Sequence, residues 1–384
     1  MVTRSSAAVE TCLFIIGGGP AGLATALAAR KRGLDVIVAD RGQPPVDKAC
    51  GEGIMPDGVA ALREMGVELT AADGPPFRGI RFLDCSTIQA EAAFPNGQCG
   101  FGVRRTRLHQ ILADAAERAG ATLWWQSPVE DLAEGAVTAG GRAVHCQWIV
   151  GADGAQSRVR EWCGLKPAWT TARRVGLRQH FRVEPWTDFV EVYWCQQAQA
   201  YVTAVGPDEV CVAFLGIPKG AATEDWLGLF PALAKRLAGA EPAGARRGAV
   251  PMSSRLTGVT RGSVALVGDA SGTVDAITGE GLHLAFRQAA ALADAIAAGD
   301  LRRYEIAHRQ LQRMPQHMAR LLLLLGGNGR LRRAAFRTLS AAPAVFNGLL
   351  AFHIGARRTP GIPLGLLGGA VRLLSSPRLL GPRV

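Results

Sequence analysis

Three features of the sequence predict an α/β fold in which a Rossmann-like domain carries an inserted antiparallel β-sheet substrate domain and a helical C-terminal tail. The first is a strand–helix–strand pattern over residues 12–39, with a glycine-rich turn after the first strand. The second is a run of short strands with turn residues between them over residues 175–216, typical of an antiparallel sheet. The third is a return to a buried strand and a long helix over residues 263–298.

The individual elements follow from hydrophobic spacing and turn residues. Short apolar runs at 12–16, 35–39, 121–125 and 144–150 predict buried strands, and helical spacing appears at 20–32, 56–66, 105–119 and 279–298. We therefore place a discontinuous nucleotide domain at residues 10–76, 99–165 and 250–325. The substrate domain takes residues 77–98 and 166–249, and a basic helical C-terminal region takes residues 326–384.

Length and charge limit the class of protein. The 384 residues suffice for two domains, and 48% hydrophobic with 20% charged residues is the composition of a globular α/β enzyme. The net charge of +11 is uneven, because residues 301–384 hold fourteen arginines and a single acid, Glu305. That region carries +13 and the first 300 residues carry −2, so we expect no nucleic-acid partner.

The basic C-terminal region leaves three interpretations open. Residues 318–325 and 349–358 combine leucine or phenylalanine faces with arginine, a pattern suited to an anionic membrane surface. The same segments could pack on the acidic side of the body or form a dimer contact. The run of leucines at 321–325 is far too short to cross a bilayer.

The eight cysteines are scattered, with no C-x-x-C pair and no histidine at metal spacing, so we expect no metal site. Scattered thiols in a chain of this size are typical of a reducing compartment. Residues 1–10 lack the apolar core of a secretory signal. We expect a cytoplasmic protein, with possible membrane association through the basic region.

The glycine-rich turn has the spacing G-x-G-x-x-G at residues 17–22. Gly17 permits the sharp turn, Gly19 leaves room for a pyrophosphate, and Gly22 lets the helix pack on the strand. The helix beginning at Pro20 and Ala21 would direct free amides at the phosphates. Asp40, at the end of the next strand, is placed to accept hydrogen bonds from ribose hydroxyls. This motif alone does not separate NAD from FAD.

Three further segments select FAD. Arg105 opens a helix in R-x-x-L, residues 150–160 read V-G-A-D-G-A-Q-S-R-V-R, and residues 267–281 contain G-D followed by T-G-E-G. With the glycine loop, they resemble the FAD-dependent group of p-hydroxybenzoate-hydroxylase-like monooxygenases and geranylgeranyl reductases over most of residues 10–300.

The resemblance implies a role for each segment. Arg105 would reach the pyrophosphate, with Arg104 as the competing candidate, Asp153 would cap a helix beside it, and Asp269 would bind the ribityl chain. The amides after Gly279 would face the flavin, where negative charge develops on reduction. The predicted cofactor-binding residues are Gly17, Gly19, Pro20, Ala21, Gly22, Asp40, Arg41, Arg105, Asp153, Gly268, Asp269, Gly279, Glu280 and Gly281.

The reaction type stays open between two chemistries that the resemblance implies. One is hydroxylation of a hydrophobic aromatic or polyketide-like molecule, with NAD(P)H as the transient reductant, and we favour it by a small margin. The other is reduction of an isoprenoid or quinone double bond. The T-G-E-G string and A-C-G-E-G at residues 49–53 are closer to the reductase side.

Candidate residues for the chemistry and the substrate are less distinctive. Cys50, His180, Tyr201 and His283 are weak candidates for a catalytic group. Aromatic residues of the inserted sheet are expected to form an apolar wall over the cofactor, and the predicted substrate-binding residues are Trp194, Tyr201 and Phe214.

Overall fold

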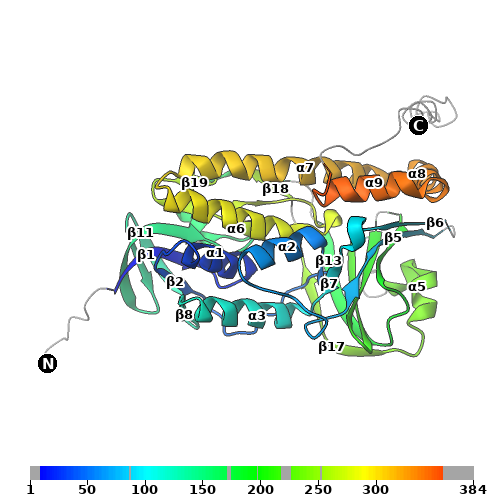
Figure 1. The fold of residues 1–384 in the computed structure, drawn as a ribbon, viewed down its shortest axis with the longest axis horizontal. Coiled ribbons are helices and arrows are strands. Elements are labelled where there is room, and N and C mark those ends of the chain that lie inside the picture. The colour runs from blue at the N-terminus through cyan, green and yellow to red at the C-terminus, as the bar shows by residue number, and fades with distance from the viewer. Residues whose placement is uncertain are drawn as a thin grey trace, which may run out of the picture.

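The computed structural model describes residues 9–85, 88–170, 174–196, 198–217, 226–250 and 253–357. Two large sheets lie side by side along the longest axis, and helices from the last third of the chain lie over both (Figure 1). The chain enters the first sheet, crosses to the second, and returns twice, which is why each half is built from separated segments.

An eight-stranded sheet forms the nucleotide half, with strand order β19-β20-β11-β1-β2-β8 and β10 and β9 continuing from β11. Its centre is parallel, and Leu13 lies opposite Val36 on one side and Trp148 on the other. The apolar run of β1 is fully buried, as a central parallel strand requires. The strands are β1 (Val9–Ile16), β2 (Val36–Ala39), β8 (Thr122–Trp124), β9 (Val129–Ala133), β10 (Ala136–Ala139), β11 (Arg142–Gly151), β19 (Thr260–Arg261) and β20 (Val264–Leu266).

Helices pack on this sheet through alanine and leucine faces. Helix α1 (Pro20–Arg30) contacts both α3 (Arg105–Arg118) and α6 (Gly281–Ala297), and α7 (Leu301–Gly327) packs on α6. Two short helices, α2 (Pro56–Glu64) and α4 (Arg158–Trp162), belong to the same half, and α2 packs on α6. The predicted strand–helix–strand unit and the long helix after residue 279 are therefore present, with ends shifted by a few residues.

The inserted sheet has seven strands in the order β17-β13-β16-β15-β14-β5-β6. It is antiparallel except between β5 and β14, which run parallel because the chain leaves and re-enters the substrate half between them. The antiparallel arrangement predicted over residues 175–216 is confirmed. The strands are β5 (Gly79–Asp84), β6 (Gln89–Ala93), β13 (Val175–Arg182), β14 (Phe189–Cys195), β15 (Ala198–Gly206), β16 (Glu209–Gly216) and β17 (Glu241–Ala249).

The two faces of this sheet bury different partners. One face packs on α5 (Pro231–Arg236) and the preceding turn, where Phe214 contacts Trp226 and Phe230. Side chains alternate along each strand, so Trp194 and Leu215 belong to the opposite face. Small sheets join the halves: β3 (Gly53–Ile54), β7 (Gly100–Gly102) and β4 (Pro76–Phe77) form one, and β12 (Pro167–Thr170), β18 (Ser254–Leu256) and β21 (Gly272–Thr273) form the other.

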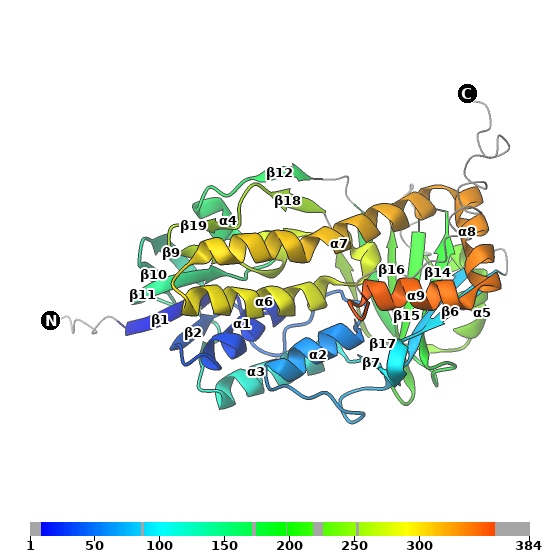
Figure 2. The same ribbon diagram turned by 45° about the horizontal axis from the view of Figure 1, so that its top comes forward.

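The C-terminal region packs on the inserted sheet. Helices α8 (Gly329–Ala341) and α9 (Pro343–His353) cover β5 and β6 (Figure 2), and Phe82 stacks on Phe336 at 5.3 Å between ring centroids. Arg332 is buried and its Nε donates to Asp84 at 2.7 Å. Part of the basic C-terminal region therefore packs on the body of the protein. Residues 358–384 lie outside the described residues, and no helix within the described part is long and apolar enough to cross a membrane.

Candidate FAD site

One large cavity of about 1530 Å³ runs from the glycine loop of the first sheet to the C-terminal helices over the second. This volume exceeds the roughly 300–1,000 Å³ of ordinary small-molecule pockets. The loops after β1, β11 and β20, which are far apart in sequence, meet at the end of the cavity beside the glycine loop. Carboxyl ends of neighbouring parallel strands lie at one edge of a sheet, which is why three separated motifs converge here.

Three glycines of the first loop are each required for a different geometric reason. Gly17 has φ +111°, and an added Cβ would lie 2.5 Å from the carbonyl oxygen of Ala152. A Cβ on Gly22 would lie 1.8 Å from the carbonyl oxygen of Gly17, so Gly22 serves helix packing and does not line the cavity. At Gly19 an added Cβ meets no protein atom within 4 Å and the residue lines the cavity, so it leaves space for a ligand.

Asp40 and Arg41 line the same end of the cavity. Asp40 Oδ2 accepts a hydrogen bond from the Gly18 N–H at 2.7 Å, and Oδ1 accepts one from the Gly42 N–H at 2.7 Å. The carboxylate therefore holds the glycine loop against the end of β2. Its predicted contact with a ribose stays a prediction.

The structure separates the two adjacent arginines. Arg104 forms an ion pair with Glu209 of the inserted sheet. Arg105 lines the cavity, its backbone N–H donates to Glu52 Oε1 at 2.9 Å, and its buried Nε has no hydrogen-bond partner among the described residues. Arg105 is therefore the arginine available to an anionic ligand.

Asp153 and Asp269 occupy the other two loops. Asp153 Oδ2 accepts from the N–H groups of Arg158 and Val159, at 2.7 and 3.2 Å, so it caps the start of α4, while its buried Oδ1 has no partner within the described chain. Asp269 is exposed to the cavity between buried neighbours, and its carboxylate makes no hydrogen bond or ion pair with the described residues.

The last loop turns sharply before α6. Gly268 has φ +62° and Gly279 has φ +70°, and Gly279 and Gly281 line the cavity with open space where a Cβ would be. Glu280 between them does not line this cavity. Its side chain is 3% exposed and faces α9 and a second cavity, so its prediction as a cofactor contact is not supported by the geometry.

The weak catalytic candidates divide into two groups. Cys50 and Tyr201 line the main cavity, and Tyr201 donates its hydroxyl hydrogen to the Ile277 carbonyl at 2.8 Å. Burial raises the pKa of Tyr201 and of the Cys50 thiol, so both keep their protons near neutral pH. His180 and His283 do not line the main cavity.

The predicted substrate wall needs one correction. Trp194 and Tyr201 line the cavity, but Phe214 belongs to the apolar cluster on the opposite face of the sheet. The parity of β16 decides this, because each successive residue of a strand changes face. The cavity wall instead includes Ile80, Phe82, Val190 and Val192.

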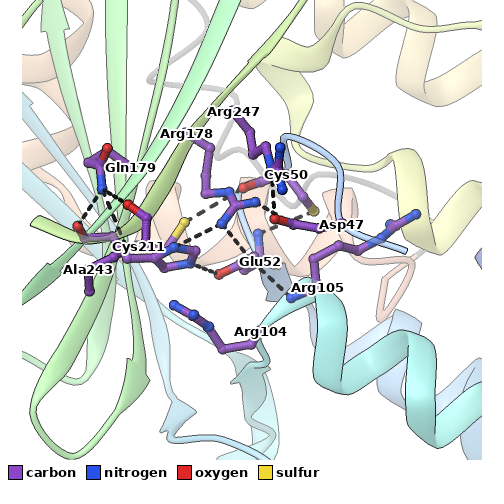
Figure 3. A network of polar contacts seen from close by, with 12 residues as sticks. Asp47, Cys50, Glu52, Arg104, Arg105, Arg178, Gln179, Cys211, Ala243 and Arg247 are labelled. Carbon is purple, nitrogen blue, oxygen red and sulfur yellow. Dashed lines mark hydrogen bonds and ion pairs between the residues drawn. The ribbon is translucent and has the colours of Figure 1, made fainter. Parts of the chain in front are cut away.

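A buried polar network beside the cavity was missed by the sequence interpretation (Figure 3). Glu52, at φ +60°, accepts from His180 Nε2 at 2.6 Å, and Arg178 contacts His180 Nδ1 at 2.9 Å. Because a guanidinium only donates, Nδ1 accepts and Nε2 carries the proton. Arg178 also pairs with Asp47, which accepts from Arg247 Nε at 3.0 Å. The network anchors the loop at 47–53 to the inserted sheet.

The same network brings Cys211 close to Glu52 and His180, with one ligand atom of each within 4.8 Å of the others. A cation there would face the buried guanidinium of Arg178. Burial also raises the pKa of the Cys211 thiol well above 9.0, whereas a metal-bound cysteine is a thiolate. These charges favour a hydrogen-bonded support over a metal centre. The sequence analysis had named Glu52, within A-C-G-E-G, and His180 as a weak catalytic candidate, but it did not predict that they meet.

The polar end of the main cavity fits a dinucleotide of the FAD type. A glycine cradle open at Gly19, helix amides at α1 and α6, an unpaired Arg105 and a free Asp269 are the groups that a pyrophosphate and a polyol chain require. When bound, FAD supplies hydride and electron-transfer chemistry, and the protein supplies binding and orientation. Fold and site together define the class of FAD-dependent oxidoreductases.

Comparison with known proteins places the chain more closely. The family described as the FAD binding domain matches residues 9–299, so the chain belongs to that family. A menaquinone reductase of Mycolicibacterium smegmatis is 27% identical over 80% of each chain. A digeranylgeranylglycerophospholipid reductase of Methanosarcina acetivorans is 27% identical over 70% of this chain and 71% of its own. A flavoprotein/dehydrogenase from Cytophaga hutchinsonii has a similar fold, with TM-score 0.78, 18% identity, and 90% and 93% coverage.

Proposed function

We propose that this FAD-dependent enzyme reduces a carbon–carbon double bond in the isoprenoid chain of a quinone-like lipid. One observation carries the proposal, namely the change of polarity along the main cavity. Charged side chains line its dinucleotide end, whereas none of the described residues that line it from β5, β14, β15, α7, α8 and α9 is charged at neutral pH.

The apolar end has the size and composition that a long hydrocarbon chain needs. Beyond Trp194 and Tyr201 the cavity is lined almost entirely by aliphatic and aromatic residues. Burial of apolar surface stabilises a ligand by about 25 cal/mol per Å² and needs no directional partner. These residues are Met318, Leu321, Leu322, Leu324, Leu325, Leu331, Ala334, Ala335, Leu339, Val345, Phe346, Leu349 and Leu350.

The relatives support the same substrate class. Two relatives that match over most of both chains carry names that specify a quinone and a geranylgeranyl lipid. Aromatic hydroxylation, which the sequence alone favoured narrowly, becomes the alternative outcome of the test.

The experiment is an anaerobic single turnover with the flavin already reduced. A quinone with an unsaturated isoprenoid chain is mixed with the protein, the product is reoxidised in air, and its mass is measured. A lasting gain of two hydrogens marks chain saturation, because a reduced quinone ring loses its hydrogens again in air. The same quinone with a saturated chain is the control. Product that gains an oxygen atom, and only when oxygen is present, would establish the hydroxylase instead.

A pair of variants tests the apolar end directly. Ala335→Phe fills the cavity from α8, so KM for the long-chain quinone should rise while flavin content stays normal. Ala341→Phe, on the exposed end of the same helix, is the matched control. Equal KM values in the two variants would place the substrate chain elsewhere.

The mouth of the apolar end suits a membrane surface that carries anionic lipid. Leu321 and Leu324 line the cavity, yet they are 48% and 55% exposed, and Leu323 beside them is 37% exposed. Exposed arginines accompany them on α7 and α8, and residues 306–357 contain no acid. Apolar side chains and cations at one edge are the two features that bind an anionic bilayer.

Vesicle flotation tests this surface. The protein should bind vesicles that contain phosphatidylglycerol, and bind less to pure phosphatidylcholine or at high salt. Leu321→Asp with Leu324→Asp should abolish binding, and Ile306→Asp, which is 58% exposed near the start of α7, should not. Equal binding by both variants would refute the surface.

A further inference from the structure

A second cavity of about 490 Å³ lies behind the loop that carries T-G-E-G. It is lined by the starts of α2 and α6, by the middle of α7 and by the end of α9, and exposed residues Gln98, Arg287 and Gln310 connect it to the surface. His353 lines both cavities. Glu280 lines only the second cavity, while its neighbours Gly279 and Gly281 line the first. Glu280 and His353 therefore form part of the wall between the two cavities.

Four titratable side chains gather at this wall. His353 Nδ1 lies 3.7 Å from Glu280 Oε1, and His283 Nδ1 lies 3.1 Å from Asp57 Oδ2. Glu280 Oε2 and His353 Nδ1 are buried and have no hydrogen-bond partner among the described residues. Arg287, one turn after His283, is the cation that lines this cavity, and the residues that α7 contributes are uncharged. Such a group of unpartnered titratable atoms is unusual for a purely structural wall.

The charge states at neutral pH follow from burial. Burial, and then the nearby carboxylate of Asp57, raise the pKa of Glu280 from its ordinary value of 4.5 to about 8. Burial lowers the pKa of His353 from 6.5 to about 4. Although the distance is that of an ion pair, the contact joins a protonated acid to a neutral imidazole. The acid has a proton to give, and the imidazole can pass one on.

We propose that Glu280 and His353 form a proton path that carries protons from the second cavity to the substrate in the main cavity. Addition of a hydride to one carbon of a double bond leaves an electron pair on the other carbon, which must then take a proton. His353 gives its Nε2 proton to that carbon, so a C–H bond forms and an N–H bond breaks. Glu280 gives its proton to Nδ1 as Nε2 loses its own, and a solvent proton delivered through water in the second cavity protonates Glu280 again. Exchange of the Nδ1 proton with solvent then restores the Nε2–H form of His353 before the next turnover.

This proposal rests on the proposed reduction for its acceptor, but its parts are this chain's own residues. It gives His353 a catalytic role and Glu280 the role of a positioned proton store. It also explains why the glutamate lies between two glycines that face the main cavity while its own side chain faces away.

Two measurements on the full flavin-loaded chain test the path. Infrared spectroscopy should show a protonated carboxyl band at pH 7 that is lost near pH 8, is absent in Glu280→Gln, and shifts in His353→Phe as the contact is removed. The saturation assay should run at least tenfold slower in both variants, with normal flavin content, and the wild-type rate should fall as pH rises through about 8. His317→Gln, on the exposed side of α7, is the control and should keep the wild-type rate.

The outcomes separate the two proposals. Absence of the protonated band at pH 7 overturns the path whatever the rate of saturation, and so do variants that saturate the chain at the wild-type rate. A wild-type protein that shows the band but saturates no isoprenoid chain refutes the proposed function, and it removes the acceptor that the path would serve.

Discussion

Replacement of Glu280 by glutamine should change how the stability of the protein depends on pH. The native carboxyl has a pKa of about 8, against 4.5 in the unfolded chain, because it is buried beside Asp57. Between those values the native state holds a proton that the unfolded state has released. Stability therefore falls as pH rises from about 4.5 to 8, and the neutral amide removes this dependence.

The magnitude follows from the shift. Each pKa unit corresponds to about 1.4 kcal/mol, so the carboxyl of Glu280 costs at most about 5 kcal/mol at pH 9 and about 1.4 kcal/mol at pH 5.5. The free energy of unfolding of Glu280→Gln, measured relative to wild type, should therefore rise by about 3 kcal/mol between these two pH values. Relaxation of the site makes this an upper bound.

Denaturant titrations of both proteins at pH 5.5, 7 and 9, with flavin in excess, measure the effect. Glu305→Gln is a control with the opposite sign, because hydrogen bonds from Val259 and Thr260 lower the pKa of Glu305. That variant should lose stability at pH 7, and the loss should shrink as the pH falls through the ordinary range of a glutamate. A difference between Glu280→Gln and wild type that is the same at pH 5.5 and pH 9 would show that Glu280 is not a buried neutral acid.

Three further variants, two of them with a matched control, test the FAD site by flavin content, read from the absorbance spectrum of purified protein. Asp269→Ala should lose FAD and keep the fold, because this carboxylate lines the cavity and makes no hydrogen bond or ion pair with a described residue; retention of flavin would show that the site has been assigned wrongly. Gly19→Val should lose FAD without unfolding, since a Cβ there meets open space. Gly22→Ala should instead destabilise the fold itself, because its added Cβ would lie 1.8 Å from the carbonyl oxygen of Gly17. Arg105→Ala should weaken FAD binding at least tenfold in titrations and Arg104→Ala should not, and equal losses would contradict the assignment.

The convergence of the three loops could be predicted because each loop is specified locally. Each loop depends on residues within a few positions of one another. These features are a positive φ at Gly17, an aspartate that caps α4, and a glycine turn before α6. Parallel strands then bring the loop ends to one edge of the sheet, whatever the intervening sequence does. The cofactor class could therefore be inferred from the chain alone.

Other features depended on contacts between distant segments. The sequence favoured Arg105 and kept the adjacent Arg104 as a competing candidate, and the ion pair of Arg104 with Glu209 on the inserted sheet separates them in the structure. The wrong assignment of Phe214 came from strand parity, which turns on a single residue of register. The direction of Glu280 depends on α9, more than sixty residues later.

The cofactor class and the order of the elements follow from local sequence, because glycine conformation, capping and strand periodicity act within a few residues. The packing of distant segments sets which charges meet at the Glu52–His180 network and which acid is left protonated at α6. It also decided that α7–α9 lie over an apolar channel. Burial and desolvation require a packed environment. A strongly shifted pKa or an apolar wall therefore forms only where distant segments exclude water together.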